Sequence, residues 1–372
     1  MDPESIRRRQ SLKVIISESI MVLAVVITVI ILALLVSGYW LNSDFEVERQ
    51  GMLQISSVPT GADVYIDGET AWLQRTNTSK VLASGEHSIT LTKDDYDSWS
   101  KTINITEGLL YRIHYPRLFL KDRVKETAYD AVGATQIFVS DNHETMLLYH
   151  GDISSLDTSV YTKPLTGTAE ELSAVLPEWT LLNLNSDRIE PKAVDLRTLY
   201  DFFKVPEPST NQNRVADFNP ELKLAGTEEL IFSKFYDDRY LTILDGTTVT
   251  VYKKETEEPI LVTELSFTPT KATAGHEGEF SIFSAGPQLA TLDMETMSIK
   301  EWQVDGASFD WFDSDMIYSV KDGELFVYDF DGLNRRSLAT NVSERFPVIL
   351  VSDKYFYYFS DGNLIREWLI PR

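Results

Sequence analysis

The chain has 372 residues, a formal net charge of −23 and no cysteine. Its length exceeds that of one ordinary domain, so we expect two or three folded parts. The absence of cysteine excludes disulfides, thiolate metal sites and cysteine nucleophiles. The acidic charge argues against nucleic acid as a partner, because it repels phosphate backbones.

The N-terminal segment differs from the rest in charge and hydropathy. Residues 1–43 hold four basic and three acidic side chains, a sum of +1, which leaves −24 for the remainder. No charged residue occurs from Ser19 to Ser43. This stretch is long enough to cross a hydrocarbon core about 30 Å thick. We therefore predict a short basic cytoplasmic tail at residues 1–13, a transmembrane signal anchor at 14–41 and a linker at 42–50.

Basic side chains precede the predicted anchor and acidic side chains follow it. By the positive-inside rule, the N-terminus then lies in the cytoplasm and the remaining domains are extracytoplasmic, with the lipid bilayer as the partner of residues 14–41. Tyr39 and Trp40 stand where an aromatic belt is expected. The alternative is a cleaved signal peptide with its cut near residues 36–38, although the apolar run exceeds the usual length of about 7–15 residues.

Residues 51–120 alternate between short strand patterns and turns. Pro59 fixes φ and Gly61 accepts a positive φ, so the sequence VPTGA predicts a turn. Asp67 and Gly68 have the composition of a hairpin turn. We expect this part of the chain to form a small all-β sandwich.

The sequence SVPTGADVYIDGE, followed by ASGEHSITLTKDDYDSWSKTINITEG, resembles a PEGA domain. The likeness rests on a Pro-x-Gly-Ala turn, a strand that ends in Asp-Gly, a Gly-Glu-His before another strand and a later Lys-x-x-Tyr. It departs from the family pattern at Thr60, which replaces Glu, and at QRTNTS, which replaces Gly-x-Thr-Pro. The resemblance implies adhesion or spacing at the bacterial envelope rather than catalysis. Its structural candidates are Pro59, Gly61, Ala62, Asp67, Gly68, Gly85, Glu86, His87 and Tyr96.

Four glycines recur in the C-terminal part at a nearly constant spacing. Gly246, Gly286, Gly323 and Gly362 lie 40, 37 and 39 residues apart, each before a strand pattern. A period of this size is the length of a β-propeller blade. Two less regular blades are expected upstream. Residues 125–372 therefore predict a β-propeller of five to seven blades, with six preferred.

One of the repeats, LFVYDFDGLNRRSLAT, resembles the repeat of TolB-type propellers, in which Asp-x-Asp-Gly precedes Asn-x-Arg-x-Leu. Asp331 and Gly332 supply its predicted turn. A calcium loop of the EF-hand type is disfavoured because the third ligand and the distal Glu are missing. Upstream, residues 207–213 are polar and have prolines nearby, which predicts an exposed loop.

The sequence contains no recognised motif for catalysis, cofactor binding or metal binding. It lacks both a Gly-x-Ser-x-Gly elbow and a Gly-x-x-x-x-Gly-Lys loop, and His143 and His150 are seven residues apart instead of the four that a zinc helix needs. We predict no catalytic residue, no cofactor and no metal. An enzyme stays an open alternative, because 57 acidic residues will include some close pairs.

Taken together, these patterns predict an all-β protein outside one N-terminal transmembrane helix. The first functional hypothesis is a single-pass extracytoplasmic binding or scaffold protein of the bacterial cell envelope that recognises a cell-wall polymer or an envelope protein. The first alternative is a glycan-active enzyme that uses paired carboxylates on the propeller. The second is a sensor that signals through the helix to a separate partner.

Overall fold

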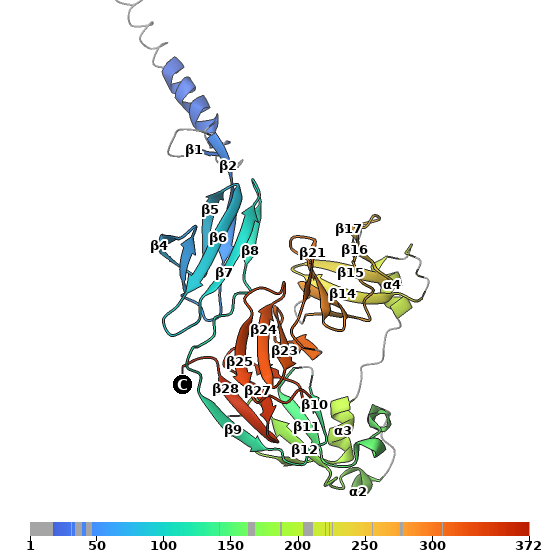
Figure 1. Ribbon diagram of the computed structural model, residues 1–372. Helices are drawn as coiled ribbons and strands as arrows, with labels where there is room; N and C mark the ends of the chain where they lie inside the picture. Colours follow the sequence, from blue (N-terminus) through green and yellow to red (C-terminus); the bar gives the residue numbers. More distant parts are fainter. Residues whose placement is uncertain are drawn as a thin grey trace, which may run out of the picture. The chain divides into compact units, whose positions relative to one another are not determined.

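The computed structural model divides the chain into two compact units, Met1–Leu118 and Phe119–Arg372. Both are built mainly from β-strands (Figure 1). The predicted basic tail lies outside the described residues. The structure describes the chain apart from residues 1–17, 31, 34–38, 42–46, 141, 163–167, 187, 204–210, 220, 223, 225, 255, 276–277, 307 and 372.

The N-terminal apolar segment is helical over residues 18–30 and 32–33. Within the part of the chain that the structure describes, no helix has both the length and the apolar character of a membrane span. Tyr39–Leu41, which we expected at the end of the helix, form strand β1 instead and pair with residues 47–49 of β2. Aromatic side chains favour strands, and the paired strand begins inside the predicted linker.

The first unit contains two four-stranded sheets among its described residues. One has the order β1-β2-β5 with β8 parallel to β2, and the other has the antiparallel order β4-β3-β6-β7. The strands are β2 (Val47–Ile55), β3 (Asp63–Ile66), β4 (Glu69–Arg75), β5 (Thr78–Ala83), β6 (Gly85–Thr92), β7 (Trp99–Ile105) and β8 (Leu110–Ile113).

Alternate side chains of these strands form the core of the first unit. Leu53 of β2, Ile89 of β6 and Trp99 of β7 are at most 1% exposed. Gly51 lies where β2 approaches β7, since a Cβ on this residue would lie 2.5 Å from Cγ2 of Ile105. The alternation of apolar and polar residues thus places one face of each sheet in a common core.

The second unit contains five four-stranded antiparallel sheets among the residues that the structure describes. The first is β10 (Gln136–Val139), β11 (Thr145–Tyr149), β12 (Trp179–Asn183) and β13 (Lys192–Ala193), and the second is β14 (Glu229–Phe235), β15 (Asp238–Asp245), β16 (Thr248–Lys253) and β17 (Leu261–Glu264). The third is β18 (Lys271–Ala274), β19 (Phe280–Ala285), β20 (Gln288–Asp293) and β21 (Ser298–Gln303), and the fourth is β22 (Ser308–Trp311), β23 (Met316–Lys321), β24 (Glu324–Asp329) and β25 (Arg336–Thr340).

The fifth sheet joins the two ends of the second unit. Its order is β26 (Ile349–Val351), β27 (Tyr355–Ser360), β28 (Asn363–Trp368) and then β9 (Lys125–Asp130), the first strand of the unit. The sequence analysis preferred six repeats, whereas the described residues form five such sheets. The difference arises because the two blades expected upstream of Gly246 are one sheet, β10-β11-β12-β13.

Apolar clusters connect the five sheets in the order first, fifth, fourth, third and second. Short helices cover the remaining face of the first sheet and of the second sheet. The first sheet is covered by η2 (Thr158–Thr162) and α3 (Leu196–Phe203), and the second by α4 (Asn211–Phe218). The long connection between β11 and β12 also carries η1 (Ile153–Ser155) and α2 (Ala169–Leu172).

Candidate functional site

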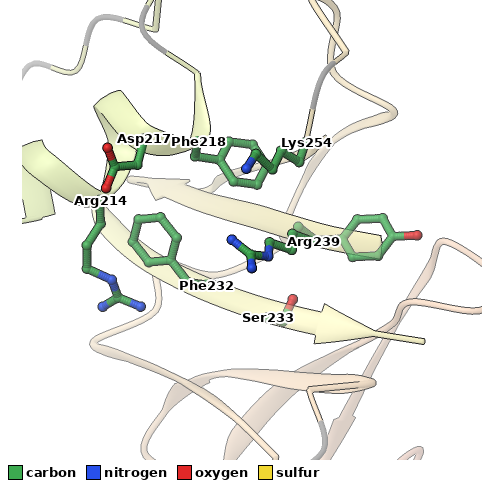
Figure 2. A pocket seen from close by; sticks show the side chains of 8 residues that line it. Arg214, Asp217, Phe218, Phe232, Ser233, Arg239 and Lys254 are labelled. Atoms are coloured by element: carbon green, nitrogen blue, oxygen red, sulfur yellow. The ribbon is translucent and has the colours of Figure 1, made fainter. Parts of the chain in front are cut away.

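A hollow of about 240 Å³ opens beside α4 and the first two strands of the second sheet. Figure 2 shows the side chains that line it. Three come from α4, two from β14, two from β15, and one follows β16. They are Arg214, Asp217, Phe218, Phe232, Ser233, Arg239, Tyr240 and Lys254.

Helix α4 is held on the second sheet by apolar residues three positions apart. Val215 and Phe218 are 4% and 9% exposed and belong to the same cluster as Leu241 and Ile243 of β15. This spacing puts both side chains on one face of a helix. The loop expected at residues 207–213 was therefore wrong in its last three positions, since α4 already begins at Asn211.

Backbone pairing places Arg239 and Lys254 beside one another. The Lys254 N–H donates to the Arg239 carbonyl at 2.8 Å. In Figure 2 the Arg239 guanidinium and the Lys254 amino group lie on the same side of Ser233. The neighbouring Lys253 has an ion pair with Asp238 at 2.7 Å, whereas neither Arg239 nor Lys254 forms one with any residue that the structure describes.

Aromatic rings form the apolar wall of the hollow. The Arg214 guanidinium lies 4.0 Å from the centroid of the Phe232 ring. Phe218 meets Phe232 edge to face, with centroids 6.5 Å apart. Burial, together with the nearby Asp238 charge, raises the pKa of Tyr240 and keeps this side chain a neutral phenol. The wall therefore offers flat apolar surface next to the cations.

Ser233 borders the hollow, but its side chain lies on the other face of the second sheet, the face that Ile231 and Tyr240 share. The residue is 9% exposed, and its Oγ has no hydrogen-bond partner among the described residues. A buried hydroxyl without a partner costs free energy that a hydrogen bond would recover. The hollow itself combines flat apolar surface with cations that form no ion pair among the described residues, a composition that suits an anionic ligand.

The lining residues do not form a pair of acids. Asp217 is the one carboxylate among the described side chains that line the hollow. Hydrolysis of a glycosidic bond by the usual mechanism requires two carboxyl groups that flank it. The hollow therefore fits binding better than glycan cleavage. Sequence reasoning missed this site, because isolated Arg, Lys and Ser residues in an acidic chain form no local motif.

The structure places the PEGA-like candidates in turns and core positions of the first unit. The peptide bond before Pro59 is cis, and Gly61 has φ +78°. Ala62 is fully buried and donates its N–H to Thr76 Oγ1 at 3.0 Å. Tyr96 is 6% exposed in the core. These residues shape the chain and do not line the hollow described above.

A second group of these candidates meets around the turn between β3 and β4. Asp67 and Gly68 form this turn with φ of 54° and 80°. Asp67 Oδ2 lies 2.7 Å from His87 Nδ1, and Asp67 Oδ1 accepts the Ser88 N–H at 2.8 Å. Gly85 begins β6, and Glu86 beside it is exposed. The structure thus brings Asp67 and His87 together as an ion pair that fixes β6 against the turn.

The Asp67–His87 pair has shifted pKa values. Burial lowers the pKa of His87, but hydrogen bonds to Asp67 and to the Ala83 carbonyl, with the Asp67 charge, raise it overall. The hydrogen bond with His87 and then the Ser88 N–H lower the pKa of Asp67. The charged form of each partner is thus favoured in the folded state.

The pair is expected to stabilise the first unit most between about pH 4 and pH 6.5, the ordinary pKa values of Asp and His. Its contribution is lost as pH rises through the raised pKa of His87, and it is lost as pH falls through the lowered pKa of Asp67. Asp67→Asn should therefore lower the pKa of His87. An NMR titration of the histidine rings in the full chain measures this, and an unchanged pKa would contradict the pairing.

The glycines of the repeats lie in two-residue turns between the second and third strands of their sheets. Gly246, Gly286, Gly323 and Gly362 have φ between +58° and +78°. Their places follow from the strand pairs that flank them. Such hairpin turns require positive φ, which glycine adopts without steric cost.

Asp331 and Gly332 lie in the turn between β24 and β25. Asp331 is 5% exposed, and its Oδ1 accepts the Leu333 N–H at 3.2 Å. Gly332 has φ +79° and lies against the indole of Trp302. Both residues therefore lie in a turn.

Comparison with known families identifies part of the first unit. Residues 50–117 match the PEGA domain. The PEGA domain covers less than a fifth of the chain and contains most of the two sheets of the first unit. A search of curated proteins returned no significant match.

Comparison with solved structures gives distant likenesses. The crystal structure of Kluyvelomyces marxianus Hsv2 aligns with a TM-score of 0.27 and 10% identity over 63% of this chain and 61% of that one. Hydrazine synthase of Kuenenia stuttgartiensis aligns with a TM-score of 0.24 and 12% identity over 62% and 56% of the two chains. The computationally designed Ika4 protein aligns at 0.28 and 13% over 40% of this chain and 96% of its own. Likenesses this low carry no argument about function.

Proposed function

We propose that this protein is a single-pass, membrane-anchored binding protein of the bacterial cell envelope, with its PEGA domain and its second unit outside the cytoplasm. The match of residues 50–117 to the PEGA domain carries the proposal. A PEGA domain suggests a protein associated with the extracellular surface. The partner we propose is a cell-wall polymer or an envelope protein.

The N-terminal helix supports the proposed anchor. Its large apolar side chains are exposed on all sides, and those of Ile20, Met21 and Leu23 are 58–64% exposed. A helix that is apolar all round requires an apolar environment from outside the chain. The uncharged run from Ser19 to Ser43 is long enough to cross a bilayer, and the bilayer would supply this apolar environment.

The arrangement of the second unit supports a recognition role. Its five four-stranded sheets and the pairing of β9 with β28 are features that a β-propeller would share. We interpret residues 125–372 as a propeller-type recognition domain. The cationic hollow beside α4 is its proposed binding site, and no catalytic step is assigned to it.

A retention experiment tests the proposed function. The full chain in detergent is passed over isolated cell wall and over solubilised envelope proteins, each at two salt concentrations. We expect retention on the wall or on one envelope protein. Loss at high salt would indicate a charge-dependent contact. Retention on neither material would contradict the proposal and favour assays of glycan turnover.

A further inference from the structure

We propose that the hollow beside α4 binds a phosphate monoester carried on a single ring. This inference deepens the proposed binding function and rests on it. Arg239 and Lys254 would hold the phosphate, and Phe232 and Phe218 would contact the ring. Arg214 lies beyond the Phe232 ring in Figure 2 and completes the positive rim.

The charge of the hollow is the first argument for a phosphate. Three cations, Arg214, Arg239 and Lys254, face one acid, Asp217, so the lining has a formal charge of +2. The whole chain carries −23. A phosphate monoester carries about −1.5 to −2 near pH 7, which matches this local charge better than a single carboxylate does.

The donors of the hollow are the second argument. Arginine presents a planar fork that matches two phosphate oxygens, and lysine binds phosphate as a point charge. The hydrogen bond between the Lys254 N–H and the Arg239 carbonyl holds the two main chains together, so both cationic side chains begin at the same edge of the hollow.

The size and walls of the hollow define the rest of the ligand. Its volume of about 240 Å³ is below the range of about 300–1,000 Å³ typical of sites for drug-sized ligands. One ring with its phosphate is therefore the expected occupant. The edge-to-face pair of Phe218 and Phe232 provides the apolar wall on which a ring can stack.

Titration calorimetry of the full chain with phenyl phosphate tests the inference. We expect saturable binding by the wild type and at least about 10-fold weaker binding by the double variant Arg239→Gln/Lys254→Gln, because two charge-assisted contacts are lost.

The matched control is the double variant Arg188→Gln/Lys192→Gln. Both residues are exposed on or next to the first sheet and do not line the hollow, so the same charge is removed elsewhere. Its affinity for phenyl phosphate should equal that of the wild type. No binding by the wild type, or equal loss in both double variants, would overturn the inference.

A competition experiment, in which phenyl phosphate is added to the chain retained on envelope material, distinguishes the two possible sources of the phosphate. It also tests this inference separately from the proposed function. If phenyl phosphate releases the chain from envelope material, the natural phosphate belongs to that material; if it binds without releasing the chain, the natural ligand is soluble. Both results support the site. Retention on the envelope without any binding of phenyl phosphate overturns this inference and leaves the proposed function standing. Binding of phenyl phosphate without retention on the envelope contradicts the proposed function and leaves this inference standing.

Discussion

Gly332→Ala is expected to lower the free energy of unfolding by about 2–4 kcal/mol. The residue has φ +79°, a conformation that strains alanine, and the new Cβ would lie 2.6 Å from Cδ2 of Trp302. The indole is not free to move away, because its Nε1–H donates to Thr291 Oγ1 at 3.0 Å. Urea unfolding of the full chain, followed by circular dichroism, measures the change.

Gly246→Ala is the matched control for this prediction. Gly246 also has positive φ, +60°, but no atom lies within 4 Å of the position that a Cβ would take. Gly246→Ala should lower the free energy of unfolding by about 1–2 kcal/mol, because it adds backbone strain alone. Equal destabilisation by the two variants would show that contact with Trp302 contributes nothing.

Arg123→Ala is expected to lower the free energy of unfolding by about 3–5 kcal/mol, because it leaves a buried carboxylate without its cation. Arg123 Nε lies 2.7 Å from Glu367 Oε1, and the two side chains are 13% and 7% exposed. The guanidinium also donates to the carbonyls of Leu120 and Leu338 at 2.7 and 2.6 Å. These bonds tie the segment before β9 to β28 and β25, so their loss should loosen the fifth sheet.

An exposed ion pair of the same unit is the control for Arg123→Ala. Lys253 and Asp238 are 2.7 Å apart, with side chains 39% and 47% exposed. Lys253→Ala should shift the urea midpoint far less than Arg123→Ala does, since solvent screens such a pair. Urea midpoints of the two variants give the comparison. A loss in Arg123→Ala as small as that in Lys253→Ala would mean that the buried pair does not stabilise the unit.

Local signals in the sequence were sufficient to predict where the turns lie. Gly286 and Gly323 can be recognised because a two-residue hairpin turn needs a positive φ, and a single glycine is enough to provide it. The same holds for Asp67 and Gly68 in the PEGA domain. The sequence alone thus predicts where the chain reverses and that the protein is rich in β-strands.

Long-range pairing could not be predicted in the same way. β9 begins at Lys125 and pairs with β28, which ends at Trp368, and no local pattern identifies a partner so distant in the chain. The difference between six expected repeats and five sheets has another origin, since the two repeats expected upstream of Gly246 pair with each other in one sheet. The first sheet was also hard to recognise, since residues 150–178 interrupt it between β11 and β12.

The candidate site depends on tertiary structure in the same manner. Arg214 comes from a helix that was expected to be a loop at its start, whereas Arg239 and Lys254 meet through strand pairing. Each is an ordinary surface residue in the sequence. Only Val215 and Phe218, apolar residues three positions apart, could have indicated that a helix lies beside the second sheet.

Labelling of single cysteines in intact cells tests most directly whether both units are displayed outside the cytoplasm. The chain has no cysteine, so each introduced thiol is the one reactive site for a membrane-impermeant maleimide. Glu86→Cys in the PEGA domain and Lys192→Cys in the second unit replace exposed residues, and Ser11→Cys lies in the predicted cytoplasmic tail. We predict labelling of the first two in intact cells and of the third after lysis only. Labelling of Ser11→Cys in intact cells, with Glu86→Cys and Lys192→Cys protected, would contradict the account.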